Sequence, residues 1–481
     1  MYIAICALLP LIGGPISALI RFRSERARNL YLMGVTLITS ISVFVCAFAL
    51  PPDTLRLFKL SQNFVCLFGV DGLSRFFLCL VGALWPLALL YAFEYMRHEE
   101  RTGNFFVFYT MAYGVTLLLA SSRNLFTLYI FFECLTVVTL PLVEHGQNKE
   151  AYRAGRAYLM YLIGGTSLGF AAMVIVHCMA GSEAVFTYGG LGAEGPLTLK
   201  RVAFILAFIG FGVKAAVFPL SRWLPKASVA PTPVTALLHA VAVVNAGVYS
   251  VARAVYYVFD CRDIAGSYAQ YAPMLLASAT VLYGAVRALR ETHLKRRLAW
   301  STVSNLGYML FALSLLSQSA LTAALCHMLF HSLMKIALFF AAGAVMVKSG
   351  RTDIHEMRGL AKYMPFTFFA FTLSGAALTG VPPLCGFTSK YLIITSALEG
   401  AGAFELIGIG CLIASAILTA FYIFTCAVPA YFAPPGGGEM KKIDMGPQMK
   451  ISVGAVLLAI LAVSLFADRI IALLRHLQEA L

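Results

Sequence analysis

The chain has 481 residues, of which 60% are hydrophobic and only 12% charged, with a mean hydropathy of +0.83. A soluble domain of this size cannot hide so much apolar surface, so the composition excludes a soluble protein and predicts one membrane domain. A net charge of +14 is typical of proteins that bind nucleic acid. Lysine and arginine at the cytoplasmic ends of helices explain most of that charge, so we do not expect nucleic-acid binding.

Apolar runs of about 20 residues predict fourteen membrane-spanning helices. The predicted spans are 2–20, 30–50, 76–96, 105–121, 124–143, 157–180, 201–220, 234–258, 272–289, 298–317, 321–347, 365–396, 404–430 and 451–473. The fold class is therefore an all-α polytopic membrane protein, with residues 1–481 as a single domain.

The distribution of lysine and arginine predicts the orientation. If the loop 21–28 is cytoplasmic, that side carries 23 of these residues and the opposite side carries 9. Since cytoplasmic loops are enriched in positive charge, both termini are expected on the non-cytoplasmic side. The expected location is the inner (plasma) membrane of the cell.

Two of the spans are expected to be broken. In 201–226, Pro219 follows Lys214 by five residues, and in 365–396 the Pro382–Pro383 pair precedes Lys390 by seven. Proline removes a helical hydrogen bond, and freed backbone at membrane depth must line a cavity or find protein partners. Paired broken segments are typical of transporters built from repeats. We predict repeats at 105–258 and 272–430, after N-terminal helices in 1–104 and before a last helix at 451–473.

The span 323–347 carries His327, His331 and Lys335, which are four residues apart. A helix places them in a row on one face, over about 12 Å of its axis at ~1.5 Å per residue. Titratable groups in a membrane usually face a protein or water interior and mark an ion or proton path. A single histidine here would indicate only a hydrogen bond between helices, but a lysine in register with two histidines favours a functional role.

Glu133 lies in the middle of its span, and Lys214 in the first broken span is its natural counter-ion. Pairing keeps both groups charged, whereas separation favours deprotonation of the lysine, so the pair is a possible proton switch. The alternative is a static ion pair that fixes helix packing. His239, after the first break, is either a structural hydrogen-bonding residue or a link between Lys214 and the row. Lys390 has no carboxylate in its own span and ends the series.

Other polar residues are interpreted as structural. Arg253 lies near an outer span end and can extend to the interface, and Asp71 is expected to start a helix. Glu94 and His177 receive no role. The chain has no phosphate-binding loop, no nucleophile–base set and no CxxC motif, so we expect no active site, bound metal or cofactor of its own.

Several stretches resemble a known family. They are VDGLSRFF (70–77), FFECLTVVTLPL (131–142), the run 210–253, HLKRRLAWSTVSNLGYM (293–309), CHMLFHSLMKIALFFAAGAV (326–345) and ALTGVPPLCGFTSKYLI (377–393). The chain is similar to the antiporter-like proton-channel subunits of respiratory complex I and to their relatives in membrane-bound NiFe hydrogenases and Mrp-type cation/proton antiporters.

The resemblance implies about 14 transmembrane helices with two inverted five-helix repeats, each containing a broken helix. It also implies a buried axis of charges through the middle of the membrane. Glu133 and Lys214 match the family's glutamate–lysine pair, and His239 the histidine after the first break. The row matches the linking histidines and central lysine, and Lys390 the terminal ionisable residue.

Three departures accompany the resemblance. No long lateral helix follows the last span before Leu481. The sixth span, YLMYLIGGTSLGF, lacks the extra charged pair of some members, and the span after the first break has HAVAVVNAGVY where some members carry a lysine.

The function expected is proton translocation within a redox-driven membrane complex, with H⁺ as the ion and Na⁺ as the alternative. The expected partners are homologous membrane subunits, a redox module of the quinone-oxidoreductase or hydrogenase type, and the lipid bilayer. Membership of a Mrp-type Na⁺/H⁺ antiporter without redox chemistry is the main alternative. A structural scaffold is disfavoured, because it has no reason to carry the cost of buried charges.

Overall fold

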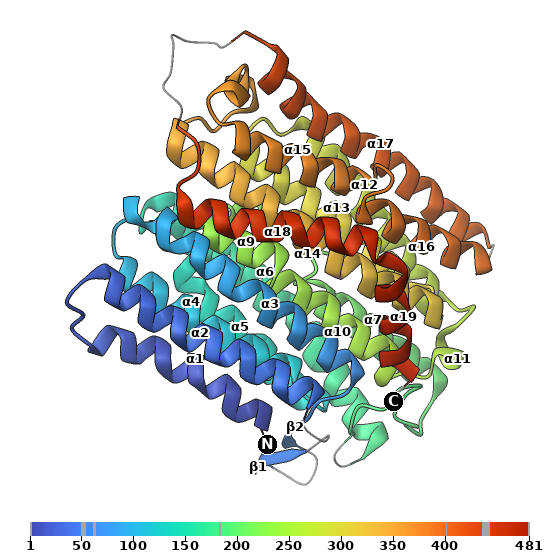
Figure 1. Ribbon diagram of the computed structural model, residues 1–481. Helices are drawn as coiled ribbons and strands as arrows, with labels where there is room; N and C mark the ends of the chain where they lie inside the picture. Colours follow the sequence, from blue (N-terminus) through green and yellow to red (C-terminus); the bar gives the residue numbers. More distant parts are fainter. Residues whose placement is uncertain are drawn as a thin grey trace.

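The computed structural model describes residues 2–49, 54–60, 64–181, 184–400, 402–434 and 443–479. The helices run side by side through the molecule, and both ends of the chain lie at the same end of the bundle (Figure 1). The helices of the first half are α1 (Tyr2–Leu19), α2 (Glu25–Phe48), α3 (Gly72–Tyr95), α4 (Thr102–Ala120), α5 (Leu125–Val143), α6 (Lys149–Ala180), α7 (Leu197–Gly212), α8 (Trp223–Ala227), α9 (Thr232–Ala240) and α10 (Val243–Tyr257).

The second half is also helical. Its helices are α11 (Cys261–Ile264), α12 (Tyr268–Arg290), α13 (Leu294–Ser314), α14 (Gln318–Ser349), α15 (Pro365–Thr379), α16 (Cys385–Gly400), α17 (Ala403–Phe432), α18 (Pro447–Leu465) and α19 (Ala467–Glu479). Short 3₁₀ helices are η1 (Met96–His98), η2 (Leu220–Arg222), η3 (Ile354–Met357) and η4 (Leu360–Lys362). An antiparallel hairpin that was not predicted from the sequence, β1 (Leu55–Lys59) and β2 (Val65–Phe68), follows α2.

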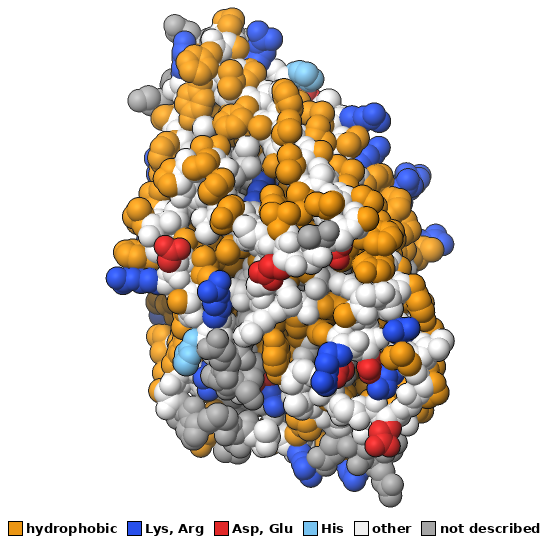
Figure 2. Space-filling model, turned by 90° about the vertical axis from the view of Figure 1, so that its right-hand side faces the viewer, with side chains coloured by type: hydrophobic (Ala, Val, Ile, Leu, Met, Phe, Trp, Pro, Cys, Tyr) orange, Lys and Arg blue, Asp and Glu red, His pale blue; other side chains and the backbone are white. Residues whose placement is uncertain are grey.

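The prediction of an all-α polytopic membrane protein is confirmed. Among the described residues, 11 helices are long and apolar enough to cross a membrane. The remaining predicted spans correspond to the short helix α7, to α13 with its basic start, and to the broken pair α15–α16. In the view of Figure 2, hydrophobic side chains cover most of the upper part of the surface, as expected for a face in contact with lipid. The division into two repeats stays a prediction.

Helix α14 occupies the centre of the bundle. It packs against α3, α9, α13, α15, α16 and α18, and α18 crosses in front of it in Figure 1. It has 32 residues, begins at the Ser317 cap and ends at Gly350, whose φ of 71° suits glycine. Ala320 to Val345 are buried with few exceptions, so the polar side chains of this helix face protein and not lipid.

Both predicted breaks are present. After α7 ends at Gly212, the Trp223 indole donates to the Val213 carbonyl (3.0 Å) and Thr280 accepts from the Phe218 N–H (2.9 Å). Between α15 and α16, the Ser464 hydroxyl accepts from the Cys385 N–H (2.8 Å). Neighbouring side chains therefore bind three of the backbone groups at the breaks, in agreement with the need for hydrogen-bond partners inside a membrane.

Two predicted spans differ from the structure. The span 234–258 is divided into α9 and α10 at Val241 and Ala242, where the Asn245 amide donates to the Ala240 carbonyl (2.8 Å). This break was not predicted from the sequence, because the segment reads as one apolar run. Asn245 is the single residue that indicates it. The last span, 451–473, is two helices that meet at Phe466.

Glu94, which receives no role from the sequence, joins α3 to α18. It is buried, and its carboxylate accepts from the Gln448 N–H (3.0 Å) and the Met449 N–H (3.1 Å) in the first turn of α18. The Lys348 amine lies 3.7 Å from the Glu94 carboxylate. The first N–H groups of a helix have no partner within it, so this carboxylate acts as the cap of α18.

We expect Glu94→Ala to lower the free energy of unfolding by about 2 kcal/mol, because it removes two charge-assisted hydrogen bonds from a helix start. Thermal unfolding of the detergent-solubilised chain measures the loss. The matched control is Glu100→Ala, on an exposed residue close by. Equal stability of the two variants would show that Glu94 does not anchor α18.

Candidate functional site

The row on α14 is fully buried. His327, His331 and Lys335 each have 0% of their surface exposed, and the rings of the two histidines are 6.0 Å apart between centroids. The helical spacing thus places all three groups in the centre of the bundle, as the sequence predicts. Buried polar groups are costly unless they have partners, so the contacts of each group decide what the row can do.

His327 connects the row to α16. Its Nδ1 lies 2.9 Å from the Ser389 hydroxyl, and its ring stacks on Tyr308 of α13 at 5.5 Å. Ser389 directly precedes Lys390, whose amine lies 5.4 Å from the same Tyr308 ring. His327 and Lys390 therefore both contact one aromatic ring, and one serine links their helices.

Lys390 binds backbone exposed by the second break. Its Nζ donates to the carbonyls of Leu378 (2.8 Å) and Thr379 (2.9 Å), the last two residues of α15. Carbonyls at a helix end have no donor within the helix and carry partial negative charge. The broken helix thus supplies the partner for this lysine, and no carboxylate is needed.

Lys335 and His239 both lie near the ring of Phe339, at the other end of the row. The Lys335 amine donates to the Leu298 carbonyl at 2.9 Å and to the Ser301 hydroxyl, both on α13. The ring of Phe339, one turn further along α14, lies 6.0 Å from this amine and 4.9 Å between centroids from the ring of His239. His239 Nε2 is 3.4 Å from the Ser228 hydroxyl.

Lys214 lies in the first break, also fully buried. Its amine donates to the Phe132 carbonyl on α5 and lies 3.7 Å from the centroid of the Phe132 ring. Gly247 of α10 packs on this segment so closely that an added Cβ would collide with the backbone of Ala215. A glycine is therefore required for α10 to hold Lys214 in place.

The expected ion pair between Glu133 and Lys214 is not formed at hydrogen-bonding distance. Among the described residues, the amine is bonded to the residue before Glu133, and one carboxylate oxygen of Glu133 is buried without a partner. Glu133 is half-buried, on a side of α5 where Cys134 and Val137 are exposed. The two residues are neighbours, but the backbone carbonyl takes the place in which the sequence predicts the carboxylate.

Four ring nitrogens in this region have no hydrogen-bond partner within the described part of the chain. They are Nδ1 of His239, Nε2 of His327 and both nitrogens of His331. Buried polar atoms in native proteins are nearly always partnered by protein or water. Within the described residues, no contact joins Lys214 directly to His239, so Lys214 stands apart from the row on α14 and its neighbours His239 and Lys390.

A fourth buried lysine was missed from the sequence. Lys295 of α13 is 4% exposed and donates to the Ala230 carbonyl at 2.6 Å. Its place in the basic run HLKRR indicates a cytoplasmic loop charge instead. The same run contains Arg297, which is also buried and binds the Tyr422 carbonyl (2.9 Å) and Thr425 (2.7 Å). The position of Lys295 and Arg297 directly before an apolar run is the sequence feature that could have indicated their burial.

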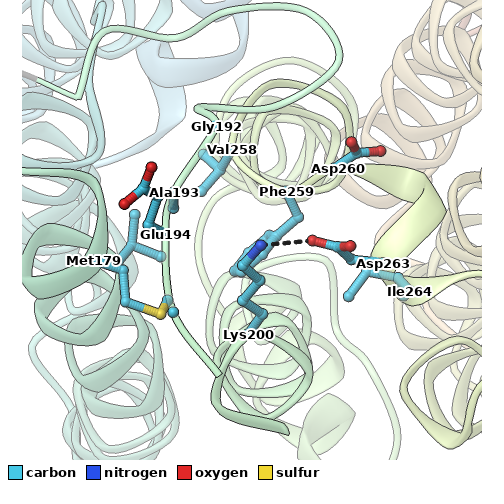
Figure 3. Close-up of a pocket in the computed structure, with 12 residues that line it drawn as sticks. Met179, Gly192, Ala193, Glu194, Lys200, Val258, Phe259, Asp260, Asp263 and Ile264 are labelled. Atoms are coloured by element: carbon cyan, nitrogen blue, oxygen red, sulfur yellow. Dashed lines mark hydrogen bonds and ion pairs between the residues drawn. The ribbon is translucent and has the colours of Figure 1, made fainter. Parts of the chain in front are cut away.

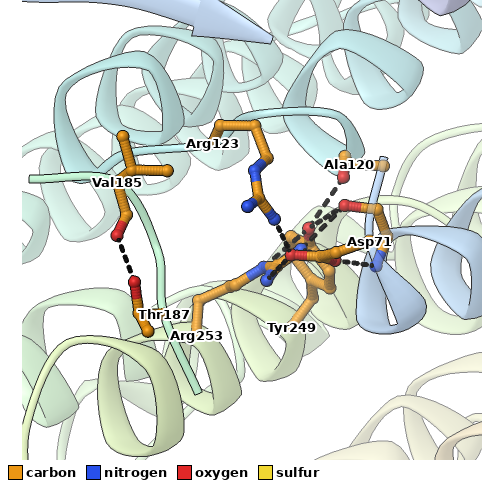
Figure 4. Close-up of polar contacts among 8 residues, drawn as sticks. Asp71, Ala120, Arg123, Val185, Thr187, Tyr249 and Arg253 are labelled. Atoms are coloured by element: carbon orange, nitrogen blue, oxygen red, sulfur yellow. Dashed lines mark hydrogen bonds and ion pairs between the residues drawn. The ribbon is translucent and has the colours of Figure 1, made fainter. Parts of the chain in front are cut away.

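Arg253 does not extend to the interface as expected. It is fully buried, and its guanidinium binds both carboxylate oxygens of Asp71 at 2.5 and 2.6 Å (Figure 4). Arg123 binds the same carboxylate. Asp71 also accepts from the Ser74 N–H at 2.9 Å, which confirms its predicted place at a helix start. This cluster ties α3, α5 and α10 together at one end of the bundle.

An open cavity lies near the same end of the bundle. It has a volume of about 420 Å³ and lies beside the start of α7, the end of α6 and α11. Lys200 forms an ion pair with Asp263 inside it (2.8 Å), while Glu194 comes from the loop on the other side (Figure 3). Its lining contains none of the four buried lysines, so it is separate from the row.

The broken helices and the buried amines define a polytopic membrane protein organised around ionisable groups. Residues 122–417 match the family model described as NADH:quinone oxidoreductase/Mrp antiporter, TM. NADH-quinone oxidoreductase subunit N of Desulforudis audaxviator is 30% identical over 426 residues, covering 84% of this chain and 82% of that protein. The chain belongs to the NADH:quinone oxidoreductase/Mrp antiporter family.

Two further similarities are informative. A Na(+)/H(+) antiporter subunit of Alkalihalophilus pseudofirmus is 33% identical over 384 residues, which is 75% of this chain. The chain spans only 47% of the length of that relative. A chain in the structure of an archaeal respiratory complex, the membrane-bound sulfane sulfur reductase, has the same fold, with a TM-score of 0.88 and 23% identity over 99% of this chain and 97% of that one.

Proposed function

We propose that this chain is a proton-translocating subunit of a redox-driven membrane complex, and that protons move along Glu133, Lys214, His239, Lys335, His331, His327 and Lys390. One observation supports this proposal above all. Each of the buried lysines donates to a backbone carbonyl, and within the described residues none of them has a carboxylate within ion-pair distance. A static structural lysine would be expected to have a counter-ion.

This arrangement suits reversible protonation. Desolvation disfavours the ammonium form of an amine, and a carbonyl dipole compensates for it less than a carboxylate does. Each amine can therefore lose its proton at moderate cost, while the serine and carbonyl partners hold it in position. Imidazole is the side chain best suited to pass a proton on near neutral pH, because its two nitrogens can accept and donate in turn.

The histidines provide the connection in this proposal. Three of their four unpartnered nitrogens, on His327 and His331, belong to the part of the row between Lys335 and Lys390, and the fourth is on His239. Water molecules with two or more polar neighbours would be stable beside them. Lys214 and Glu133 lie at the end of the path. A change at the α5 surface that moves Glu133 toward or away from the amine would alter the charge of Lys214. The protonation of the other residues on the proposed path would then change in turn.

A second candidate is a role within a Mrp-type Na⁺/H⁺ antiporter without redox chemistry. The antiporter relative of Alkalihalophilus pseudofirmus supports it. The first candidate is favoured because the similarity to the NADH-quinone oxidoreductase relative extends over 84% of this chain, compared with 75% for the antiporter relative. We place the chain in the plasma membrane with both termini outside the cytoplasm, on the basis of its charge distribution.

The composition of the complex that co-purifies with this chain in mild detergent, determined by mass spectrometry, tests the assignment. Iron–sulfur or hydrogenase-type subunits are the expected result, together with homologous membrane subunits. If only small membrane subunits co-purify, the redox assignment is contradicted and the antiporter is supported, and Na⁺ would then be the ion to test.

Replacing Lys214 with alanine is expected to reduce coupled proton translocation by at least about tenfold while the protein still assembles, because a proton-transferring group is lost. Glu133→Ala should have an effect in the same direction. Acidification of membrane vesicles, followed with a pH-sensitive dye, measures the change. Glu100→Ala, at an exposed site, serves as the control, and wild-type translocation in Lys214→Ala would remove this residue from the path.

A further inference from the structure

A basic cleft lies on the side of the molecule that the charge distribution predicts as cytoplasmic. It has a volume of about 610 Å³ and is formed by the start of α6, the short helix α8, the end of α12 and the start of α13. The proposed proton path does not use it. Its lining consists of Glu150, Arg153, Ala154, Arg222, Pro225, Lys226, Val229, Tyr283, Arg287, Glu291, Arg296 and Trp300.

Positive charge dominates this cleft. Five lysine or arginine side chains line it, against two carboxylates. Arg296 pairs with Glu291 at 3.3 Å, but no carboxylate of the described residues lies within ion-pair distance of Arg153, Arg222, Lys226 or Arg287. These four cations from α6, η2, α8 and α12 therefore share the cleft with Glu150 as the one other carboxylate, and an anion bound among them would relieve their mutual repulsion.

Two aromatic residues hold the arginines in place. The Arg287 guanidinium lies over the Trp300 ring at 5.0 Å, and Arg222 Nε donates to the Tyr283 hydroxyl at 3.4 Å. Stacking leaves the edge of a guanidinium free, and this edge binds phosphate oxygens in pairs. The cleft thus presents hydrogen-bond donors in fixed orientations as well as positive charge.

The two helices on either side of the cleft also expose apolar side chains. Helices α6 and α12 both pack against α7, and exposed residues on them include Met160 and Ile163 of α6 and Val286 of α12. Tryptophan and tyrosine beside such surfaces are typical of the membrane–water boundary. A ligand with a phosphate head and hydrocarbon chains would bind both the basic cleft and the apolar surfaces beside it. Free phosphate would bind only the basic side chains.

We propose that this cleft binds the phosphate headgroup of an anionic membrane lipid, with the acyl chains lying along α6 and α12. Basic pockets between transmembrane helices on the cytoplasmic side are suited to such headgroups. The inference is independent of the proposed translocation. It predicts a lipid bound at a defined site at the junction of the two halves of the chain.

The test compares two variants that remove the same charge. The first combines Arg153→Gln, Arg222→Gln and Lys226→Gln, which leaves the Arg287–Trp300 stack and the Arg296–Glu291 pair intact. The control combines Arg21→Gln, Arg23→Gln and Arg358→Gln, which are exposed and lie outside the cleft. The full chain in detergent is titrated with phosphatidylglycerol, phosphatidylcholine or inorganic phosphate, and thermal unfolding reports binding.

Phosphatidylglycerol is expected to raise the Tm of the wild type and of the control, and phosphatidylcholine is not. The cleft variant should unfold at the same temperature as the control without lipid and bind phosphatidylglycerol roughly 100-fold more weakly, since each basic residue near an anionic headgroup contributes about fivefold. Equal affinity in both variants would overturn the proposal. Stabilisation by inorganic phosphate equal to that by phosphatidylglycerol would also overturn it, in favour of a soluble anion.

Discussion

Lys335→Met is expected to reduce proton translocation by roughly 100-fold, the scale on which the loss of a proton-transferring side chain acts. Lys335 lies between His239 and His331, and its amine is held by Leu298 and Ser301 of α13. Methionine has a similar volume and no proton to exchange, so the helix packing should be retained. Vesicles containing the assembled complex and a pH-sensitive dye measure the rate.

A second substitution separates proton transfer from charge. Lys335→Arg keeps a positive charge and hydrogen-bond donors, but a guanidinium does not release its proton, so translocation should also be lost. Lys362→Met, on an exposed lysine, should leave the rate unchanged. Normal translocation in both Lys335 variants would mean that the row on α14 serves packing alone.

Asp71→Asn is expected to lower the free energy of unfolding by about 3–5 kcal/mol, because it leaves Arg253 buried without a counter-charge. The carboxylate is the common acceptor for Arg253, Arg123 and the Ser74 N–H. Thermal unfolding in detergent measures the loss. Asp263→Asn is the matched control: it breaks the partly exposed pair with Lys200 and should cost less than about 1 kcal/mol.

The same cluster predicts a pH dependence. Burial alone would raise the pKa of the Asp71 carboxyl, but the two arginines hold it below its ordinary value, at about 2. A carboxyl whose pKa is lowered by folding stabilises the folded state above its unfolded pKa of ~3.9, and this contribution is lost as the pH falls toward 2. The wild type should lose stability relative to Asp71→Asn between about pH 4 and pH 2. Parallel pH profiles of the two proteins would exclude this role.

Local sequence patterns predicted much of this protein. The apolar runs predicted the spans, because length and hydropathy alone determine what crosses a bilayer. The spacing of His327, His331 and Lys335 predicted their common face, since helical periodicity is a local property. Proline predicted the two breaks, because it removes a hydrogen bond wherever it stands inside a helix.

Tertiary structure alone decided which partner each charge has. Lys214 and Glu133 are adjacent as predicted, yet the amine binds the Phe132 carbonyl, and Lys390 binds the open end of α15. Arg253 and Lys295, assigned to an interface and a loop, are buried because Asp71 before α3 and the Ala230 carbonyl before α9 bind them. A hydrogen bond depends on positions within about 3 Å, and residues such as Asp71 and Arg253, 182 apart in sequence, reach those positions only through helix packing.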